Sequence, residues 1–77
     1  MNSSQLLKRV ISNPKVMLGK PVIKGTRLPV ALIVEKVAYG ATLGDLRLDY
    51  PFLTEDDVRA ALLYAAKRLS LEEIHAA

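Results

Sequence analysis

Hydrophobic residues recur with helical spacing in the middle of the chain. Between positions 30 and 38 they fall three and four residues apart, which predicts an amphipathic helix with one apolar face. The apolar face consists of Val30, Ile33, Val34, Val37 and Ala38. Pro29 suits the first turn of this helix, where its missing N–H is not needed, and Gly40 suits the left-handed residue just beyond its end.

A second, shorter helix is predicted to begin at Thr42. Thr42 and Asp45 have the spacing of a capping box, with Asp at the position where Glu is usual. Leu43, Leu46 and Tyr50 supply its apolar face. Pro51 ends it, because the residue before a proline is pushed out of the helical region.

The third predicted helix begins after Thr54, an N-cap residue followed by three acidic residues in the first turn. Its expected buried stripe is Val58, Ala61, Leu62, Ala65 and Leu69. Lys67 and Arg68 are expected in its last turn, where the helix dipole favours cations. The sequence from Ser70 to Glu73 is another capping-box pattern, which indicates either a short fourth helix or a bend in a longer one.

The N-terminal segment has a different pattern. Short β-branched runs at residues 10–11, 16–18 and 22–23 lie between turn residues and predict a small β arm. Gly19 and Lys20 fit a two-residue hairpin turn. Residues 1–9 are expected to be frayed, or a short helix at best.

These elements predict a mainly α fold. We expect a three-helix, helix-turn-helix-like (homeodomain-like) bundle over residues 29–69, preceded by a short N-terminal β arm within residues 1–28 and followed by a tail at 70–77. With 77 residues, the chain is expected to be a single domain. Domains of this size bury only about 60% of the surface of the unfolded chain, so a homodimer is expected to complete the fold.

The composition narrows the function classes. The chain has no cysteine, which excludes disulfides and thiolate metal sites and fits a cytoplasmic protein. No apolar run approaches the roughly 20 residues of a membrane span, and the N-terminus lacks the features of a signal peptide. We expect no membrane association.

Charge is unevenly distributed along the chain. Residues 1–40 carry seven Lys or Arg and one acid, a net +6, whereas residues 41–77 carry four bases and seven acids, a net −3. A basic half attracts phosphate or an acidic partner, although plain solubility explains it equally well. The candidate nucleic-acid-binding residues are Lys8, Arg9, Lys15, Lys20, Lys24 and Arg27.

Residues able to do covalent chemistry are scarce. His75 is the only histidine and is the third-last residue of the sequence. The acidic run Glu55–Asp57 is explained by helix capping without a cation. We therefore expect a protein that is not an enzyme and has no cofactor, metal or catalytic site.

The most distinctive stretch runs from Gly19 to Val30 (GKPVIKGTRLPV) and is joined by a later DYPFLT segment at residues 49–54. This pattern resembles the bacterial family called domain of unknown function 433, over about residues 9–69. The motif residues are Gly19, Lys20, Pro21, Gly25, Thr26, Arg27, Tyr50 and Pro51. The resemblance implies a homeodomain-like or winged-helix-like protein, often an antitoxin encoded beside a PIN-like nuclease toxin.

The residues of the motif also have local explanations. Gly25 is expected in a backbone conformation closed to other residues, and Thr26 either hydrogen-bonds the turn or caps the next helix. Arg27 carries a planar donor fork suited to carboxylate or phosphate. We favour an internal ion pair of Arg27 with Asp49 or Glu35 over a contact with a partner.

Two functional hypotheses follow. The first is an antitoxin-like protein that binds a PIN-like nuclease, with Leu71 and Ile74 in the tail either contacting the partner or extending the core. The second is a DNA-binding transcriptional regulator that uses the basic β arm. The acids at positions 55–57 disfavour the usual reading helix of a helix-turn-helix protein, because they would face phosphate.

Overall fold

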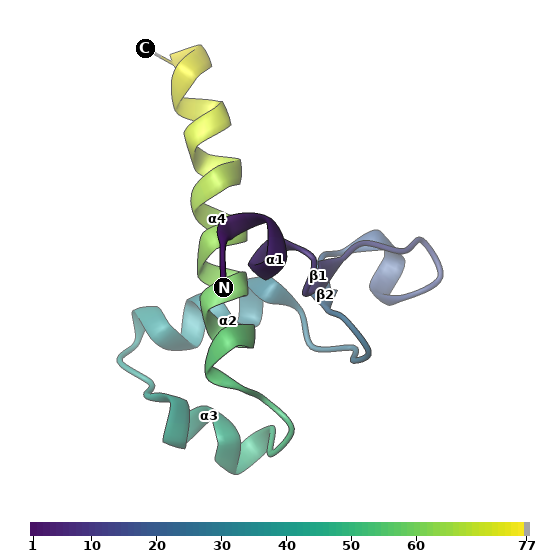
Figure 1. Ribbon diagram of the computed structural model, residues 1–77, viewed down its shortest axis with the longest axis vertical. Helices are drawn as coiled ribbons and strands as arrows, with labels where there is room; N and C mark the ends of the chain where they lie inside the picture. Colours follow the sequence, from purple (N-terminus) through teal and green to yellow (C-terminus); the bar gives the residue numbers. More distant parts are fainter. Residues whose placement is uncertain (77) are drawn as a thin grey trace.

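The computed structural model describes the backbone of residues 1–76 and the side chains of residues 1–70. The elements are α1 (Ser3–Leu7), β1 (Val10–Ile11), η1 (Met17–Gly19), β2 (Val22–Ile23), α2 (Val30–Ala38), α3 (Leu43–Asp49) and α4 (Glu55–Ala76). The long helix α4 packs against α1 and α2 near its N-terminal half, and α3 lies beyond the start of α4 (Figure 1). The expected mainly helical fold with a small β element is confirmed, whereas its helix-turn-helix character stays a prediction.

The sequence signals at the ends of α2 and α3 act as predicted. Pro29 directly precedes α2 with φ −66°, and Gly40 follows its end with φ +92°. At α3, the Asp45 N–H donates to the Thr42 hydroxyl (3.1 Å) and the Thr42 N–H donates to the Asp45 carboxylate (2.9 Å). Hydrogen bonding to the carboxylate by the Thr42 N–H, and secondarily by the Thr42 side chain, holds the pKa of the Asp45 carboxyl below its ordinary value.

The start of α4 is a full capping box, of which the sequence predicted only the N-cap residue Thr54. Thr54 accepts from the N–H of Asp57 through its hydroxyl (3.1 Å), as expected of an N-cap residue. The Asp57 carboxylate in turn accepts from the N–H of Thr54 (3.0 Å). Both groups are therefore fixed at the first turn of the helix.

The predicted buried stripe of α4 is partly wrong. Ala61 is fully buried, but Leu62 and Leu69 are exposed. The buried face instead follows Asp57, Ala60 and Ala61, with Tyr64 packed at its edge. This face contains a carboxylate where apolar periodicity would require a hydrophobic residue. A prediction from hydrophobic residues alone therefore placed the buried face too far toward Leu62.

The helix also ends later than expected. Instead of stopping near Leu69 with a second helix or a bend after it, α4 continues without interruption to Ala76. Lys67 and Arg68 consequently lie in the interior of the helix and not in its last turn. The C-terminal half of α4 extends beyond all the other elements (Figure 1).

The β arm has a different shape from the predicted hairpin. β1 and β2 pair antiparallel, with Val10 opposite Ile23 and Ile11 opposite Val22. Residues 12–21 form the connection, so the expected tight turn at Gly19 and Lys20 is wrong. The expected strand at residues 16–18 is also wrong, because the chain there enters η1 with left-handed backbone at Met17 and Leu18. β2 gains a second neighbour through a bridge between Val22 and Pro29.

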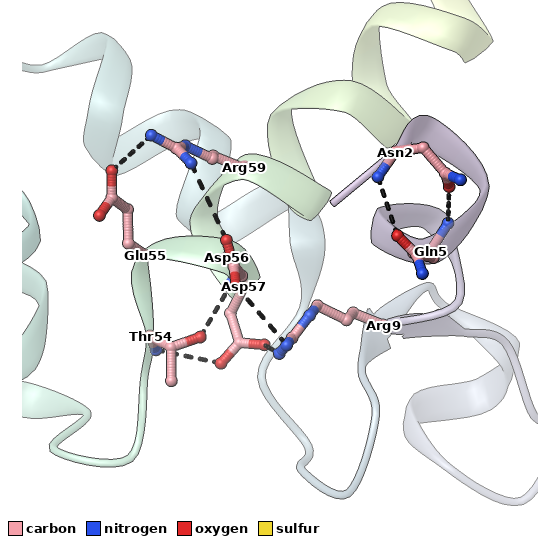
Figure 2. Close-up of polar contacts among 8 residues, drawn as sticks. All are labelled: Asn2, Gln5, Arg9, Thr54, Glu55, Asp56, Asp57 and Arg59. Carbon is pink, nitrogen blue, oxygen red and sulfur yellow. Dashed lines mark hydrogen bonds and ion pairs between the residues drawn. The ribbon is translucent and has the colours of Figure 1, made fainter.

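The first nine residues are more ordered than the polar sequence indicated. Asn2 and Gln5 form reciprocal hydrogen bonds of 2.9 and 3.0 Å that cap α1 (Figure 2). The pattern is a capping box built from Asn and Gln, which also satisfies the N–H groups at the helix start. The helix then delivers Arg9 to the beginning of β1.

The core lies where β2, α2, the N-terminal half of α4 and one residue of α3 meet. Both residues of β2 are buried, and α3 contributes Leu46 to the core. The buried cluster consists of Ile23, Leu28, Val30, Ile33, Leu46, Leu53 and Ala61. This small core explains why so much of α4 is left without a covering layer.

A polar junction connects the N-terminal segment to α4. The Arg9 guanidinium donates to the Asp57 carboxylate at 3.1 Å, and Asp56 lies 3.8 Å away on the same side (Figure 2). The Asp57 side chain is 11% exposed, compared with 38% for Asp56. Asp57 therefore serves as the cap of α4 and as the anchor of Arg9, and its burial makes both contacts stronger than a surface ion pair.

Replacing Asp57 by Ala is expected to lower the free energy of unfolding by about 2–3 kcal/mol. The substitution leaves Arg9 and the Thr54 N–H without their acceptor in a part-buried place. Denaturant unfolding measures the change. The matched control is Asp56→Ala, whose more exposed carboxylate is expected to contribute less than about 0.5 kcal/mol. Equal effects of the two substitutions would contradict the assigned role of Asp57.

Candidate functional site

A tight turn between β2 and α2 positions the most distinctive residues of the sequence. Gly25 has φ +80°, a left-handed conformation that favours glycine. The Thr26 hydroxyl donates to the Ile23 carbonyl (2.7 Å) and accepts from the Leu28 N–H (3.0 Å). Both expectations for Gly25 and for Thr26 in the turn are confirmed. The turn holds Arg27 at the surface between two fixed hydrogen bonds.

Arg27 shares a shallow hollow with residues from the other half of the motif. The hollow has a volume of about 330 Å³. We call it the turn face, defined by Arg27, Leu28, Pro29, Leu32, Tyr50 and Phe52. The rings of Tyr50 and Phe52 meet edge to face with centroids 6.2 Å apart, and Phe52 is 53% exposed. An apolar hollow with a guanidinium at its rim results.

The ion pair expected between Arg27 and Asp49 or Glu35 is absent among the side chains of residues 1–70. The acids that do form ion pairs in that part of the chain are at the start of α4, where they pair with Arg9 and Arg59. Arg27 is therefore an exposed fork of donors at the rim of an apolar hollow. Such a group is available to an acceptor from another molecule.

A second guanidinium, that of Arg47, lies at the turn that follows α3. Arg47 donates to the carbonyl oxygen of Pro51 at 3.5 Å and, like Arg27, forms no ion pair within residues 1–70. Pro51 lies between Tyr50 and Phe52, the two aromatic residues of the turn face. The segment 50–52 thus has positive charge from Arg47 on α3 and from Arg27 on the turn before α2.

The six candidate nucleic-acid-binding residues do not form one patch. Lys8 and Lys24 lie with Arg9 around a hollow of about 360 Å³ that Asp57 also lines. The charge of Arg9 is offset by Asp57 and Asp56. The others are distributed elsewhere, with Lys15 on the loop after β1, Lys20 beside α2 and α4, and Arg27 on the turn face.

The remaining predicted site residues divide between the fold and the end of the chain. Gly19 and Lys20 belong to the end of η1, where Gly19 has φ +83°, and Pro21 accepts from the N–H of Val30 (3.0 Å). Leu71 and Ile74, the predicted partner contacts, lie on the backbone of α4 beyond residue 70. Their side chains are outside the described residues.

No group of three His, Cys, Asp or Glu side chains suited to a metal ion occurs within the part of the chain that the structure describes. Nor does any helix of that part have the length and apolarity needed to cross a membrane. The features that the described residues do offer are surfaces: the turn face, the Lys8–Lys24 hollow, and an apolar groove beside α4.

The fold and these surfaces define a small, mainly helical protein with a two-stranded arm. Its sequence matches the model of the family described as "Protein of unknown function (DUF433)" over residues 10–65. The chain belongs to this family, and the resemblance seen in its GKPVIKGTRLPV and DYPFLT segments is confirmed.

Relatives with known sequences and structures add detail on fold but not on activity. An uncharacterized protein of Sinorhizobium fredii, y4eO, is 36% identical over 56 residues, which are 73% of this chain but 25% of that protein. An uncharacterized protein of Archaeoglobus fulgidus is 62% identical over 24 residues, 31% of this chain and 67% of that one. The crystal structure of a DUF433 member from Anabaena variabilis superposes with a TM-score of 0.74 at 29% identity, covering 94% of this chain and 71% of the other.

Two features of the site were not predicted from the sequence. The contact of Phe52 with Tyr50 and with the Arg27 hollow depends on how α3 folds back toward α2. Asp57 was interpreted as a helix-dipole residue only, although its place at the third position after Thr54 fits a capping box. The Thr–x–x–Asp spacing was a usable signal for the capping role of Asp57, whereas no sequence signal indicated the contact of Phe52.

Replacing Gly25 by Ala is expected to lower the free energy of unfolding by about 1 kcal/mol, because a Cβ is disfavoured at φ +80°. The cost is one of backbone conformation, since a Cβ there would meet nothing within 4 Å. Gly44→Ala is the opposite-sign control: Gly44 is helical, and its Cβ would make an ordinary 3.6 Å contact with Thr42, so a gain of about 0.5 kcal/mol is expected. Thermal unfolding of both variants measures the difference, and a neutral Gly25→Ala would show that the turn does not depend on its left-handed residue.

Proposed function

We propose that this protein is a non-enzymatic binding module of the antitoxin type, which uses the turn face to hold an acidic partner protein. The observation that supports the proposal is the exposed Arg27 guanidinium, held by a rigid turn at the rim of an apolar hollow and without an internal carboxylate within residues 1–70. The family resemblance suggests the partner, a PIN-like nuclease.

The composition of the turn face suits protein recognition. Binding energy at protein interfaces concentrates on aromatic residues and arginine set in well-packed pockets. Here Phe52 and Tyr50 supply aromatic surface, and Leu32 supplies an aliphatic wall. A partner side chain in the hollow would exclude water from the Arg27 guanidinium and strengthen its contact with a carboxylate.

The chemistry of the expected partner complements Arg27. Nucleases of the implied class have a cluster of carboxylates at the active site, and a planar guanidinium binds a carboxylate through two parallel hydrogen bonds. Insertion of Arg27 among such carboxylates would block access of a metal ion and of the nucleic-acid substrate. Inhibition then needs no catalytic group on this chain.

Arg27→Glu is expected to weaken binding of the nuclease encoded by the adjacent gene by at least about 30-fold, the effect of roughly 2 kcal/mol for a desolvated charge pair. The two proteins are co-expressed, co-purified and then measured by calorimetry. Restored nuclease activity of the toxin in the presence of the variant gives a second readout.

Lys15→Glu is the matched control for that experiment. It makes the same change of charge on an exposed residue of the loop after β1, away from the turn face, and is expected to leave affinity within about threefold of the wild type. An equal loss of affinity in both variants would show that the effect comes from overall charge and not from the turn face. Recovery of the two proteins only as separate species would defeat the proposal itself.

DNA binding is a second candidate function, supported by the meeting of Lys8 and Lys24 around one hollow. A helix-turn-helix role for α3 and α4 is less suitable, because Glu55, Asp56 and Asp57 occupy the start of α4. The remaining route is contact of the two lysines with the phosphate backbone. Such contact releases counterions and makes the affinity depend steeply on salt.

For DNA binding, the double substitution Lys8→Glu and Lys24→Glu is expected to reduce the slope of log K against log salt by about 2, one unit for each lost phosphate contact. The measurement is a gel shift with the upstream DNA at about 50 and 200 mM salt. Lys36→Glu with Lys67→Glu provides the same change of charge outside the hollow. Absence of any shift for micromolar wild-type protein at the lower salt would exclude this second function.

A further inference from the structure

An open apolar groove of about 540 Å³ runs between α2 and the middle of α4. We call it the α2–α4 groove. One wall is formed by Ala31, Val34 and Ala38 of α2, and the other by Tyr64, Ala65 and Leu69 of α4. It is separate from the proposed partner site, although Pro29 contributes to both.

The groove exists because α4 is longer than the body that supports it. The buried residues of α4 end at Ala61, Tyr64 packs at the edge of the core, and the residues from Ala66 to Ser70 are exposed. Leu69, at 58% exposure, is therefore a large apolar side chain with little of its own chain to cover it. The C-terminal part of α4 projects past every other element (Figure 1).

Small side chains make the groove accessible to another helix. Ala31, Ala38 and Ala65 face it, and their short side chains allow a second helix to approach closely. The distance between packed helices depends on the size of the side chains at the contact, with 8–10 Å as the usual range. An apolar helix of the right length would bury Leu69 and Val34 at once.

The charges on the two walls have opposite sign. Glu35 lies on the α2 wall and Arg68 on the α4 wall. A two-fold axis running along the groove places the α2 wall of one copy opposite the α4 wall of the other. In such a dimer Glu35 of each copy would face Arg68 of its partner, and the contact would occur twice because such interfaces are self-complementary.

We propose that a second copy of this chain occupies the α2–α4 groove, so that the protein is a symmetric dimer with the stretch from Tyr64 to Leu69 of each α4 packed against the α2 wall of the other copy. Tyr64, Ala65 and Leu69 of α4 supply apolar surface, and the Glu35–Arg68 pairs fix the register. A small domain that buries a limited fraction of its surface gains its missing core from such an interface.

The test is a charge exchange on the isolated chain, measured by sedimentation and light scattering. The wild type is expected to have twice the chain mass of 8.5 kDa at micromolar concentration. Glu35→Arg and Arg68→Glu each place like charges together twice per dimer and are expected to raise the dimer dissociation constant at least tenfold. An equimolar mixture of the two variants restores opposite charges at both contacts, so the dimer is expected to recover as a heterodimer.

Controls separate a specific interface from general effects of charge. Lys67→Glu changes the charge by the same amount at the residue beside Arg68 but off the groove, and it is expected to leave the dimer unchanged. Circular dichroism confirms that each variant is folded, and the double variant carrying both substitutions on one chain is expected to dimerise like the wild type.

Three results would overturn the proposal: a monomeric wild type at about 200 μM, single variants that dimerise as well as the wild type, or a mixture that does not recover. None of these involves the nuclease partner, whose binding is tested at Arg27. Failure of the dimer and failure of the proposed function are thus observed in different experiments.

Discussion

The contact between Arg9 and Asp57 is the constraint on which the arrangement of the molecule depends. Asp57 caps α4 through Thr54 and at the same time accepts from Arg9, the residue that links α1 to β1. One nearly buried carboxylate therefore connects the start of the longest helix to the N-terminal segment. Among the described side chains, the ion pairs of Arg9 with Asp56 and Asp57 are the polar contacts that connect the N-terminal segment to α4.

Local signals allowed much of the helical fold to be predicted from the sequence. Thr42 with Asp45, Pro29, Gly40 and Thr54 act within a few residues of their own positions, so their roles do not depend on the rest of the chain. The errors occur where distant residues decide. The buried face of α4 could not be found by periodicity, because Asp57 lies in that face and is satisfied by Arg9, 48 residues earlier.

In the candidate site, too, the local roles of residues were predictable and their tertiary contacts were not. The backbone role of Gly25 and the hydrogen bonds of Thr26 follow from local chemistry and are confirmed. The partner of Arg27 was a tertiary question, and two acids that are plausible in sequence turn out not to contact it. The hollow shared with Phe52 has the same origin, since it forms only when the turn after α3 lies beside the turn before α2. In each case, the feature that could not be predicted depends on contact between residues far apart in the sequence.

The two proposed surfaces have a consequence when they are considered together. Residues on α2 contribute to both, with Leu32 directed to the turn face and Val34 to the α2–α4 groove. A dimer through the groove would therefore hold two copies of the turn face in a fixed relation, set by the rigid helix between them. An acidic partner that is itself a dimer would then bind both Arg27 side chains at once, and the second contact would form at a high effective concentration. Modest affinity at each hollow, with its volume of about 330 Å³, would then suffice for a tight complex.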